Sequence, residues 1–174
     1  MDNKINSIQE QIDQSANNTD QVLSFILGHE EYGVDILRVQ EITGWENTTP
    51  IPNTPSYVMG VINLRGAVVP IIDLRVRFGL QDITYNETTV VIIVRSEDNT
   101  GAQKIIGLVV DGVSDVYTIN KKELQIAPEM SGTVQSEYVH GLATINSQLV
   151  IILHVDPLIN DGILASIKKA LNLD

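Results

Sequence analysis

The stretch GVINLRGAVVPIIDL, residues 60–74, contains two apolar runs separated by a turn at Arg65 and Gly66. This pattern predicts a β-hairpin. A second stretch, GLATINSQLVIILHV at residues 141–155, aligns with the first without gaps, so that Gly141 corresponds to Gly60. Glycine begins both stretches, and the apolar positions coincide through the second strand. The pair therefore indicates a β-unit that occurs twice.

Another pair of similar stretches lies upstream of the first. YGVDILRVQEI at residues 32–42 aligns with IGLVVDGVSDV at residues 106–116, so that Gly107 corresponds to Gly33. The two blocks occur in the same order in both halves of the chain, which favours an internal duplication. Chance similarity between strand-type sequences is the alternative.

An all-β fold is the expected result of such a duplication. Each unit offers about five short strands, and closing such a unit into a small barrel removes exposed sheet edges. We therefore expect two SH3-like, five-stranded β-barrel lobes packed around a shared hydrophobic core. The first lobe should span about residues 21–85 and the second about residues 86–155. This boundary is soft, because strands can be exchanged between the lobes.

The two ends of the chain differ in composition from this body. Residues 1–20 are polar, and Ile5, Ile8 and Ile12 recur at helical spacing. This segment is either a loose helix or a mobile tail, and we treat it as a polar N-terminal tail. Short helices are expected between strands, and residues 161–174 carry an apolar stripe that predicts a C-terminal helix.

The overall charge excludes some classes of partner. The chain of 174 residues has 11 Lys and Arg against 22 Asp and Glu, a formal net charge of −11. Nucleic acid binding requires a basic surface, so we do not expect it. The apolar runs are too short to span a bilayer, and the first residues lack a secretory signal, so we expect no direct membrane insertion. The absence of cysteine fits a cytoplasmic location.

Motifs for catalysis and for cofactor binding are missing. The three histidines, His29, His140 and His154, do not share a helix face, so no metal site is predicted. Asp111 and Gly112 lack the hydroxyl residue of an aspartic protease motif. The glycine-containing segment 101–107 is not followed by the Lys-Ser/Thr pair of a phosphate-binding loop. We therefore expect neither enzymatic activity nor a cofactor.

Five stretches together resemble the CheW family of bacterial chemotaxis adaptors. They are EYGVDILRVQEI (31–42), IPNTP (51–55), GVINLRG (60–66), VPIIDL (69–74) and VVDGVSDV (109–116). The resemblance covers nearly all of residues 21–160, and it implies the two-barrel fold expected above. The same module occurs inside the proteins CheA and CheV. Because this chain has no ATP-binding, phosphotransfer or receiver motif, it resembles the free-standing adaptor.

The resemblance also implies partners. A protein of this family would couple chemoreceptors to a histidine kinase by binding the cytoplasmic tip of the receptors and the CheW-like regulatory domain of CheA. It would meet other CheW copies in arrays, and it would be cytoplasmic and recruited to the inner face of the membrane through receptors. Two other classes stay open: a homo-oligomeric β-scaffold and a small-ligand-binding β-barrel, each without a kinase partner.

The candidate receptor-binding residues are Arg65, Val39, Glu41, Gly60, Asn63 and Val113. From the residues alone, Arg65 grips an acidic or carbonyl-rich partner surface, or it is a solvated turn arginine or one paired with a carboxylate of the same fold. The resemblance favours a receptor contact. Strand alternation sends Val39 and Glu41 to one outward face, unless Val39 lies in the core. Gly60 and Asn63 allow close approach by a partner or serve turn geometry. Val113 either joins a receptor-facing groove or packs in the core.

The candidate kinase-binding residues are Ile42, Thr43 and Gly66. The resemblance associates the stretch around Ile42 with receptor and kinase contact, and alternation sends Ile42 to the face opposite Glu41. Gly66 has the same turn alternative as Gly60. Trp45, the only tryptophan, either seals a barrel or forms an exposed hot spot for binding.

Overall fold

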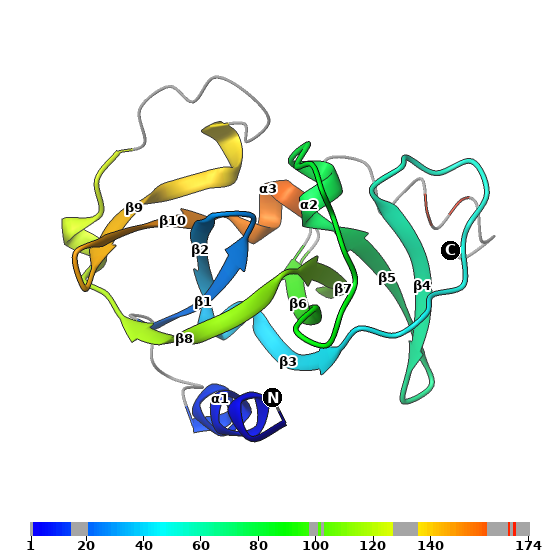
Figure 1. Cartoon of the computed structure of the whole chain (residues 1–174), viewed down its shortest axis with the longest axis horizontal. Helices are drawn as coiled ribbons and strands as arrows, with labels where there is room; N and C mark the ends of the chain where they lie inside the picture. The colour runs from blue at the N-terminus through cyan, green and yellow to red at the C-terminus, as the bar shows by residue number, and fades with distance from the viewer. Residues whose placement is uncertain are drawn as a thin grey trace.

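The computed structural model describes residues 2–14, 21–97, 101, 103–126, 136–159, 167 and 169. Within these residues, strands dominate and form two five-stranded sheets. Figure 1 shows the sheets as two curved lobes side by side, with α2 and α3 between them and α1 beneath the seam. This arrangement confirms the all-β, two-lobed fold that the sequence predicts.

Ten strands and six short helical elements make up the described part of the chain. They are α1 (Asp2–Gln14), β1 (Gln21–Leu27), β2 (Glu30–Asp35), η1 (Ile36–Arg38), β3 (Val39–Gly44), β4 (Val58–Leu64), β5 (Ala67–Asp73), α2 (Leu74–Arg77), β6 (Val90–Glu97), β7 (Gln103–Val110), β8 (Gly112–Thr118), η2 (Lys121–Glu123), η3 (Ser136–Tyr138), β9 (Val139–Ile145), β10 (Gln148–Leu153) and α3 (Val155–Ile159).

The two lobes exchange strands. Lobe A is the sheet with strand order β8-β1-β2-β10-β9, and lobe B is the sheet with order β3-β6-β7-β5-β4. The chain begins in lobe A, crosses to lobe B for β3 to β7, and returns to lobe A for β8 to β10. The expected division into residues 21–85 and 86–155 therefore does not match the sheets. The reason is parallel pairing, because β10 joins β2 and β5 joins β7 across the halves of the sequence.

The register of these parallel pairs confirms the internal duplication. Ile152 of β10 lies opposite Gly33 of β2, and Ile71 of β5 lies opposite Gly107 of β7. The two pairs are equivalent, because the aligned repeats match Gly33 with Gly107 and Ile71 with Ile152. Each glycine leaves room for its isoleucine, since a Cβ atom at Gly107 would lie 2.5 Å from the Ile71 Cδ1 atom. The sequence repeat thus corresponds to two similar lobes, each completed by strands from both halves.

A shared core joins the lobes, and each lobe also has its own small cluster. Leu23 and Phe25 of β1 belong to the same buried cluster as Ile92 of β6. The neighbours Val91 and Ile93 point the other way, into the private cluster of lobe B. The first five residues of β6, Val90–Val94, are therefore buried on both faces of the strand, which explains why they are all apolar rather than alternating.

The N-terminal segment differs from the tail expected from the sequence, and the C-terminal segment is described at two residues. Residues Asp2–Gln14 form the helix α1 instead of an unstructured tail, because Ile8 and Ile12 are buried against the shared core. The predicted C-terminal helix at residues 161–174 falls mostly outside the described residues. Of this segment the structure describes two helical residues: Ile167, which is buried, and Lys169, which is exposed.

Candidate interaction surfaces

The turn between β4 and β5 and the turn between β9 and β10 are equivalent hairpin tips. Arg65 and Gly66 have φ angles of 50° and 88°, as the central residues of a type I′ turn require. Asn146 and Ser147 hold the equivalent positions, with φ angles of 52° and 65°. At the first tip, the Asn63 Oδ1 atom accepts a hydrogen bond from the Gly66 N–H at 2.8 Å. Asn63 and Gly66 therefore serve turn geometry at an exposed position.

An exposed aliphatic side chain stands next to each of these turns. Val68 on β5 and Leu149 on β10 are both 51% exposed, and they occupy equivalent positions in the repeat. Single exposed apolar side chains are common on folded surfaces, so the feature of interest is that the two lobes repeat this position. Each lobe thus presents one exposed aliphatic side chain beside its hairpin tip.

Arg65 forms an ion pair that ties the first tip to β3. The Arg65 Nη1 atom lies 3.2 Å from the Glu41 Oε2 atom, and Nη2 bonds to Glu41 Oε1. The hydrogen bonds to Glu41 raise the pKa of Arg65 further above its ordinary value. The Arg65 side chain remains 69% exposed, whereas that of Glu41 is 17% exposed. The arginine is therefore both paired within the fold and accessible from outside.

A β-bulge in β3 changes which residues share a face. Val39 pairs with Val94 and Glu41 pairs with Ile93, so Gln40 is an extra residue. The bulge buries Val39 and Ile42 together in the shared core, at 1% and 6% exposure, and turns Glu41 outward. Of the two alternatives for Val39, the core position is therefore the one the structure shows, and Val39 and Glu41 do not share an outward face. Regular alternation fails here because the bulge adds one residue.

The other predicted residues differ in accessibility. Val113 is buried in the shared core at 9% exposure, and Thr43 is half-buried. Trp45 is also half-buried and packs against the private cluster of lobe B, with its ring centroid 4.5 Å from that of Tyr85. Arg65, Asn63 and Gly66 are thus exposed. Val113 of β8 is instead part of the shared core.

Gly60 has a structural function inside lobe B. It is buried with a φ angle of 128°, and a Cβ atom there would collide with the Thr49 carbonyl oxygen. Thr49 and Val61 exchange two backbone hydrogen bonds of 2.9 Å, so the approach is fixed from both sides. The close neighbour of Gly60 is thus a segment of its own chain.

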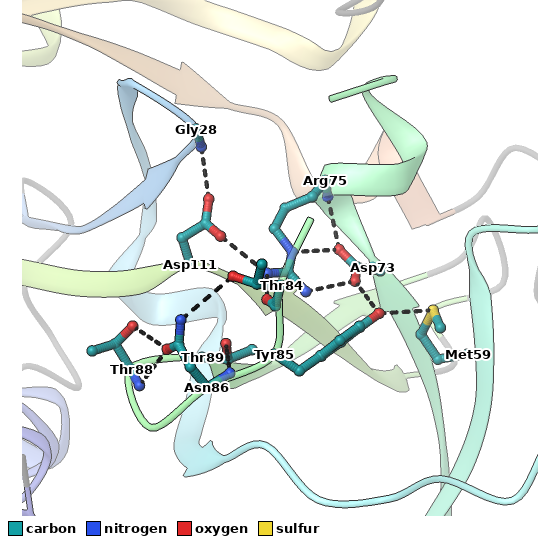
Figure 2. Close-up of polar contacts among 10 residues, drawn as sticks. All are labelled: Gly28, Met59, Asp73, Arg75, Thr84, Tyr85, Asn86, Thr88, Thr89 and Asp111. Atoms are coloured by element: carbon teal, nitrogen blue, oxygen red, sulfur yellow. Dashed lines mark hydrogen bonds and ion pairs between the residues drawn. The ribbon is translucent and has the colours of Figure 1, made fainter. Parts of the chain in front are cut away.

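A buried charge network at the lobe junction was not anticipated from the sequence. Figure 2 shows Arg75, from α2, pointing between Asp73 and Asp111. Its Nε and Nη2 atoms donate to the two carboxylate oxygens of Asp73 at 3.0 and 2.9 Å, and Nη1 donates to Asp111 Oδ1 at 3.0 Å. The Nη1 atom also donates to the Thr84 carbonyl oxygen at 2.6 Å. The Arg75 side chain is 1% exposed, so its role is to stabilise the fold rather than to contact a partner.

The same network connects lobe B to lobe A. Asp111 lies where the chain crosses between the lobes, and its Oδ2 atom accepts a hydrogen bond from Gly28 N–H at 2.7 Å. The Tyr85 hydroxyl donates to Asp73 Oδ2 at 2.7 Å. Burial and this hydrogen bond raise the pKa of Tyr85 to about 12. Burial alone would lower the pKa of Arg75, but its bonds to Asp73 and Asp111 raise it above the ordinary value. The sequence does contain one signal for this network: Asp73 and Asp111 lie within the mostly apolar stretches 69–74 and 109–116.

Two histidines that lie apart in the sequence meet at the rim of lobe A. His140 Nδ1 and His154 Nε2 are 2.9 Å apart and share a hydrogen bond. Near them, Asp156 pairs with Arg38 at 2.8 Å and accepts from the Ser96 hydroxyl at 2.7 Å. Within the described ranges, no three His, Asp or Glu side chains are grouped so that they could hold a metal ion.

His154 should titrate at a lower pH than an ordinary histidine side chain. Burial first and His140 second lower its pKa, while Asp156 acts in the opposite direction. The fold therefore favours the neutral form of His154. The stability that neutral His154 contributes is present above the ordinary pKa of about 6.5, and it is lost as the pH falls through the lower pKa of the folded state. In His140→Asn, we expect the pKa of His154 to move up but stay below about 6.5, because burial remains. NMR titration of the imidazole C2 proton measures this; an unchanged or lower pKa would contradict the assignment.

The fold and these surfaces define a two-lobed β-barrel scaffold whose distinctive features are exposed hairpin tips. A family model, the CheW-like domain, matches residues 21–162. The chain belongs to the CheW-like domain family. Over the described residues, no helix has both the length and the apolar character needed to cross a membrane.

Named relatives resemble most of the chain. It is 45% identical over 147 residues to the chemotaxis protein CheW of Klebsiella aerogenes, which covers 84% of this chain and 86% of the relative. It is 34% identical over 141 residues to the probable chemotaxis protein CheW of Rhizobium etli, covering 81% and 88%. The crystal structure of the scaffolding protein CheW from Thermoanaerobacter tengcongensis matches with a TM-score of 0.71 and 33% identity, covering 80% and 87%.

Proposed function

We propose that this chain couples chemoreceptors to the histidine kinase CheA by binding both at the same time. As a CheW-like protein it is a chemotaxis adaptor, and the observation that carries the proposal is the family match over residues 21–162. In the cell it is cytoplasmic, held at the inner face of the membrane by the receptors. It works by contact and carries out no chemistry of its own.

The two-lobed design supports simultaneous binding. Each lobe has its own hairpin tip and exposed aliphatic side chain, Val68 in lobe B and Leu149 in lobe A. Both tips are accessible, and the residues assigned below to the receptor and to the kinase all lie in lobe B. Holding both raises the local concentration of kinase at the receptor, an effect that grows when copies of the adaptor meet in an array.

We assign receptor contact to the first hairpin tip. Arg65 and Asn63 are exposed there, and Glu41 lies beside them. Arg65 keeps free donor capacity for carboxylate or carbonyl oxygens of a receptor helix. Kinase contact is assigned to the adjoining Thr43 and Gly66. The buried residues of the predicted set act indirectly, by shaping these strands: Val39, Ile42, Gly60 and Val113.

Binding of purified partners tests the assignment of two partners. Calorimetric titration of the chain with a receptor cytoplasmic fragment and, separately, with CheA should give saturable binding in both cases. A chain that binds neither and forms a large stable oligomer in light scattering would instead be a homo-oligomeric scaffold. Saturable stabilisation by a small molecule, with no binding to either protein, would identify a ligand-binding barrel.

A charge swap separates the contact role of Arg65 from its structural role. Arg65→Glu should weaken receptor binding about five- to tenfold, an effect of the size expected for a charge at an interface rim. The double variant Glu41→Arg, Arg65→Glu restores the internal ion pair with its charges reversed. We expect its thermal midpoint to lie within about 3 °C of the wild-type value, because an exposed pair contributes little stability. Its receptor binding, measured by calorimetry, should nevertheless stay weak.

The equivalent tip of lobe A supplies the matched control for this swap. Asn146→Glu adds negative charge at the position that corresponds to Arg65. Receptor affinity of this control should equal that of the wild type. Recovery of wild-type affinity in the double variant would show that Arg65 only fastens the hairpin to β3.

A further inference from the structure

Four side chains of lobe B hold the ring and the hydroxyl of Tyr85. The ring centroid lies 4.5 Å from that of Trp45, and the guanidinium carbon of Arg75 lies 4.7 Å from it. The hydroxyl donates to the Asp73 carboxylate at 2.7 Å and lies 3.7 Å from the Met59 sulfur, as Figure 2 shows. A tyrosine from the connection between α2 and β6 therefore packs onto lobe B in a defined site.

The internal repeat gives each of these four residues an equivalent in lobe A: His140 for Met59, His154 for Asp73, Asp156 for Arg75 and Ile119 for Trp45. The first three follow from the alignment of Gly60 with Gly141, and the last follows from the alignment of Gly33 with Gly107. Trp45 directly follows β3, and Ile119 directly follows β8, so the strands place them alike. All four equivalents line one cavity of about 160 Å³, which we call the lobe A cavity.

The rest of the lining is mostly aliphatic. Val22 and Ile152 line the cavity, are 1% and 4% exposed, and belong to the private cluster of lobe A. Ile119 is smaller than Trp45, which accounts for part of the open volume. An apolar cavity of about 150 Å³ is large enough to bind benzene. The lobe A cavity therefore has the size and the lining for one aromatic ring.

The two histidines of the cavity offer hydrogen bonds to a hydroxyl group. Their mutual bond of 2.9 Å engages His140 Nδ1 and His154 Nε2. The other two ring nitrogens form no further hydrogen bond with the described part of the chain. When both rings are neutral, one of these outer nitrogens is an acceptor and the other is a donor, whichever ring donates in the mutual bond. Burial, which lowers the pKa of His154, favours that neutral state.

A guanidinium group also lines the cavity. Arg38 pairs with Asp156 at 2.8 Å, and its side chain is 34% exposed. In lobe B, the Arg75 guanidinium lies over the face of the Tyr85 ring. Lobe A thus has a cation available for the same kind of contact, although it comes from η1 rather than from the helix after the hairpin.

We propose that the lobe A cavity is a binding site for a phenol ring, the chemistry that tyrosine side chains and small phenolic molecules share. The ring would lie against Ile119, and its hydroxyl would bond to an outer nitrogen of His140 or His154. The repeat carries this inference, because the residues that hold Tyr85 in lobe B have equivalents that surround a cavity in lobe A. The site includes none of the residues assigned to the receptor or the kinase, so it does not depend on the proposed function.

Titration with p-cresol, the side-chain analogue of tyrosine, is the first test. We expect saturable shifts of the Val22 and Ile152 amide resonances of the isotope-labelled full-length chain, with half-saturation on the order of 1 mM. Toluene, which lacks the hydroxyl, should bind about threefold more weakly or worse. Shifts that do not saturate, shifts that spare both amides, or equal affinities for the two compounds would overturn the proposal.

Filling the cavity is the second test. Ile119→Trp gives lobe A the residue that lobe B has at this position, and it should weaken p-cresol binding at least about tenfold. Ile126→Trp is the matched control, since Ile126 is 94% exposed and is not part of the lining, and it should bind p-cresol like the wild type. Unchanged affinity in Ile119→Trp would overturn the proposal. If that variant does not fold, His140→Leu, His154→Leu replaces it, and a retained preference for p-cresol over toluene would then contradict the assigned hydrogen bond.

A synthetic peptide of residues 80–89 identifies the source of the ring. It carries Tyr85, and the same peptide with Tyr85→Ala is its control. Shifts of the Val22 and Ile152 amides by the tyrosine peptide alone would support the proposal with a tyrosine of an extended segment as the ligand. Shifts by p-cresol but by neither peptide would support it with a small phenolic molecule. Equal shifts by both peptides would overturn it, because the phenol ring would not be what the cavity recognises.

Discussion

Replacing Gly60 with alanine is expected to destabilise the fold by about 2–6 kcal/mol, through backbone strain and weakened hydrogen bonds. The new Cβ atom would collide with the Thr49 carbonyl oxygen, and the φ angle of 128° would itself be strained in any other residue. Such strain costs about 1–3 kcal/mol, and disturbing the two hydrogen bonds between Thr49 and Val61 adds about 0.5–1.5 kcal/mol each. Urea unfolding followed by far-ultraviolet circular dichroism measures the loss. A loss of this size is a large share of the roughly 5–15 kcal/mol that stabilises a typical domain.

Gly44→Ala provides the control for this substitution. Gly44 lies at the end of β3, its φ angle is not in the left-handed region, and a Cβ atom there would meet nothing within 4 Å. Alanine at this position should change the free energy of unfolding by less than about 1 kcal/mol, through the unfolded state alone. If Gly60→Ala were as stable as Gly44→Ala, the close approach of Thr49 would have to be relieved by movement of the 49–61 bridge.

Removing the Arg75 side chain should have a comparable effect. Arg75→Ala would leave Asp73, whose side chain is 0% exposed, without its cation, and Asp111 without one of its partners. Truncating one partner of a buried ion pair typically costs about 3–5 kcal/mol, because the remaining charge is desolvated and uncompensated. Arg75→Lys should recover only a small part of this loss, since lysine cannot reproduce the forked contacts to Asp73 and Asp111. Thermal and urea unfolding measure both variants.

The exposed ion pair of Arg38 with Asp156 is the appropriate comparison. Its side chains are 34% and 39% exposed, so Arg38→Ala should cost no more than about 1 kcal/mol. The contrast between the two arginines tests whether the buried network holds the lobes together. Equal, small losses for Arg75→Ala and Arg38→Ala would mean that the lobe junction depends on apolar packing alone.

Local patterns in the sequence predicted the strands, because a strand depends on residues near one another, and comparison of distant stretches with the same pattern predicted the repeat. The hairpin at residues 60–74 and its equivalent at 141–155 are present with matching turns. The exchange of strands between the lobes was harder to predict from the sequence, because the parallel pairing of β2 with β10 joins segments near opposite ends of the chain. Sequence periodicity carries no information about which distant strand completes a sheet.

Among the candidate residues too, those placed by local sequence were predictable, and those placed by contacts with distant segments were not. Arg65, Asn63 and Gly66 lie at a turn, and a turn can be recognised from a few residues. The sequence left two alternatives for Val39, because one extra residue in β3 changes the alternation and nothing in this six-residue strand marks such a bulge. The Arg75 network needed contacts from α2, β5 and the β7–β8 crossover together, so only the fold could reveal it.

Co-sedimentation with receptor-bearing membranes tests most directly whether the adaptor bridges its two partners. CheA is mixed with these membranes while the concentration of the chain is raised, and the kinase in the pellet is quantified. We expect the pelleted kinase to rise with added chain and to fall again at large excess, when separate copies occupy each partner. Kinase that pellets to the same extent with and without the chain would contradict the bridging function.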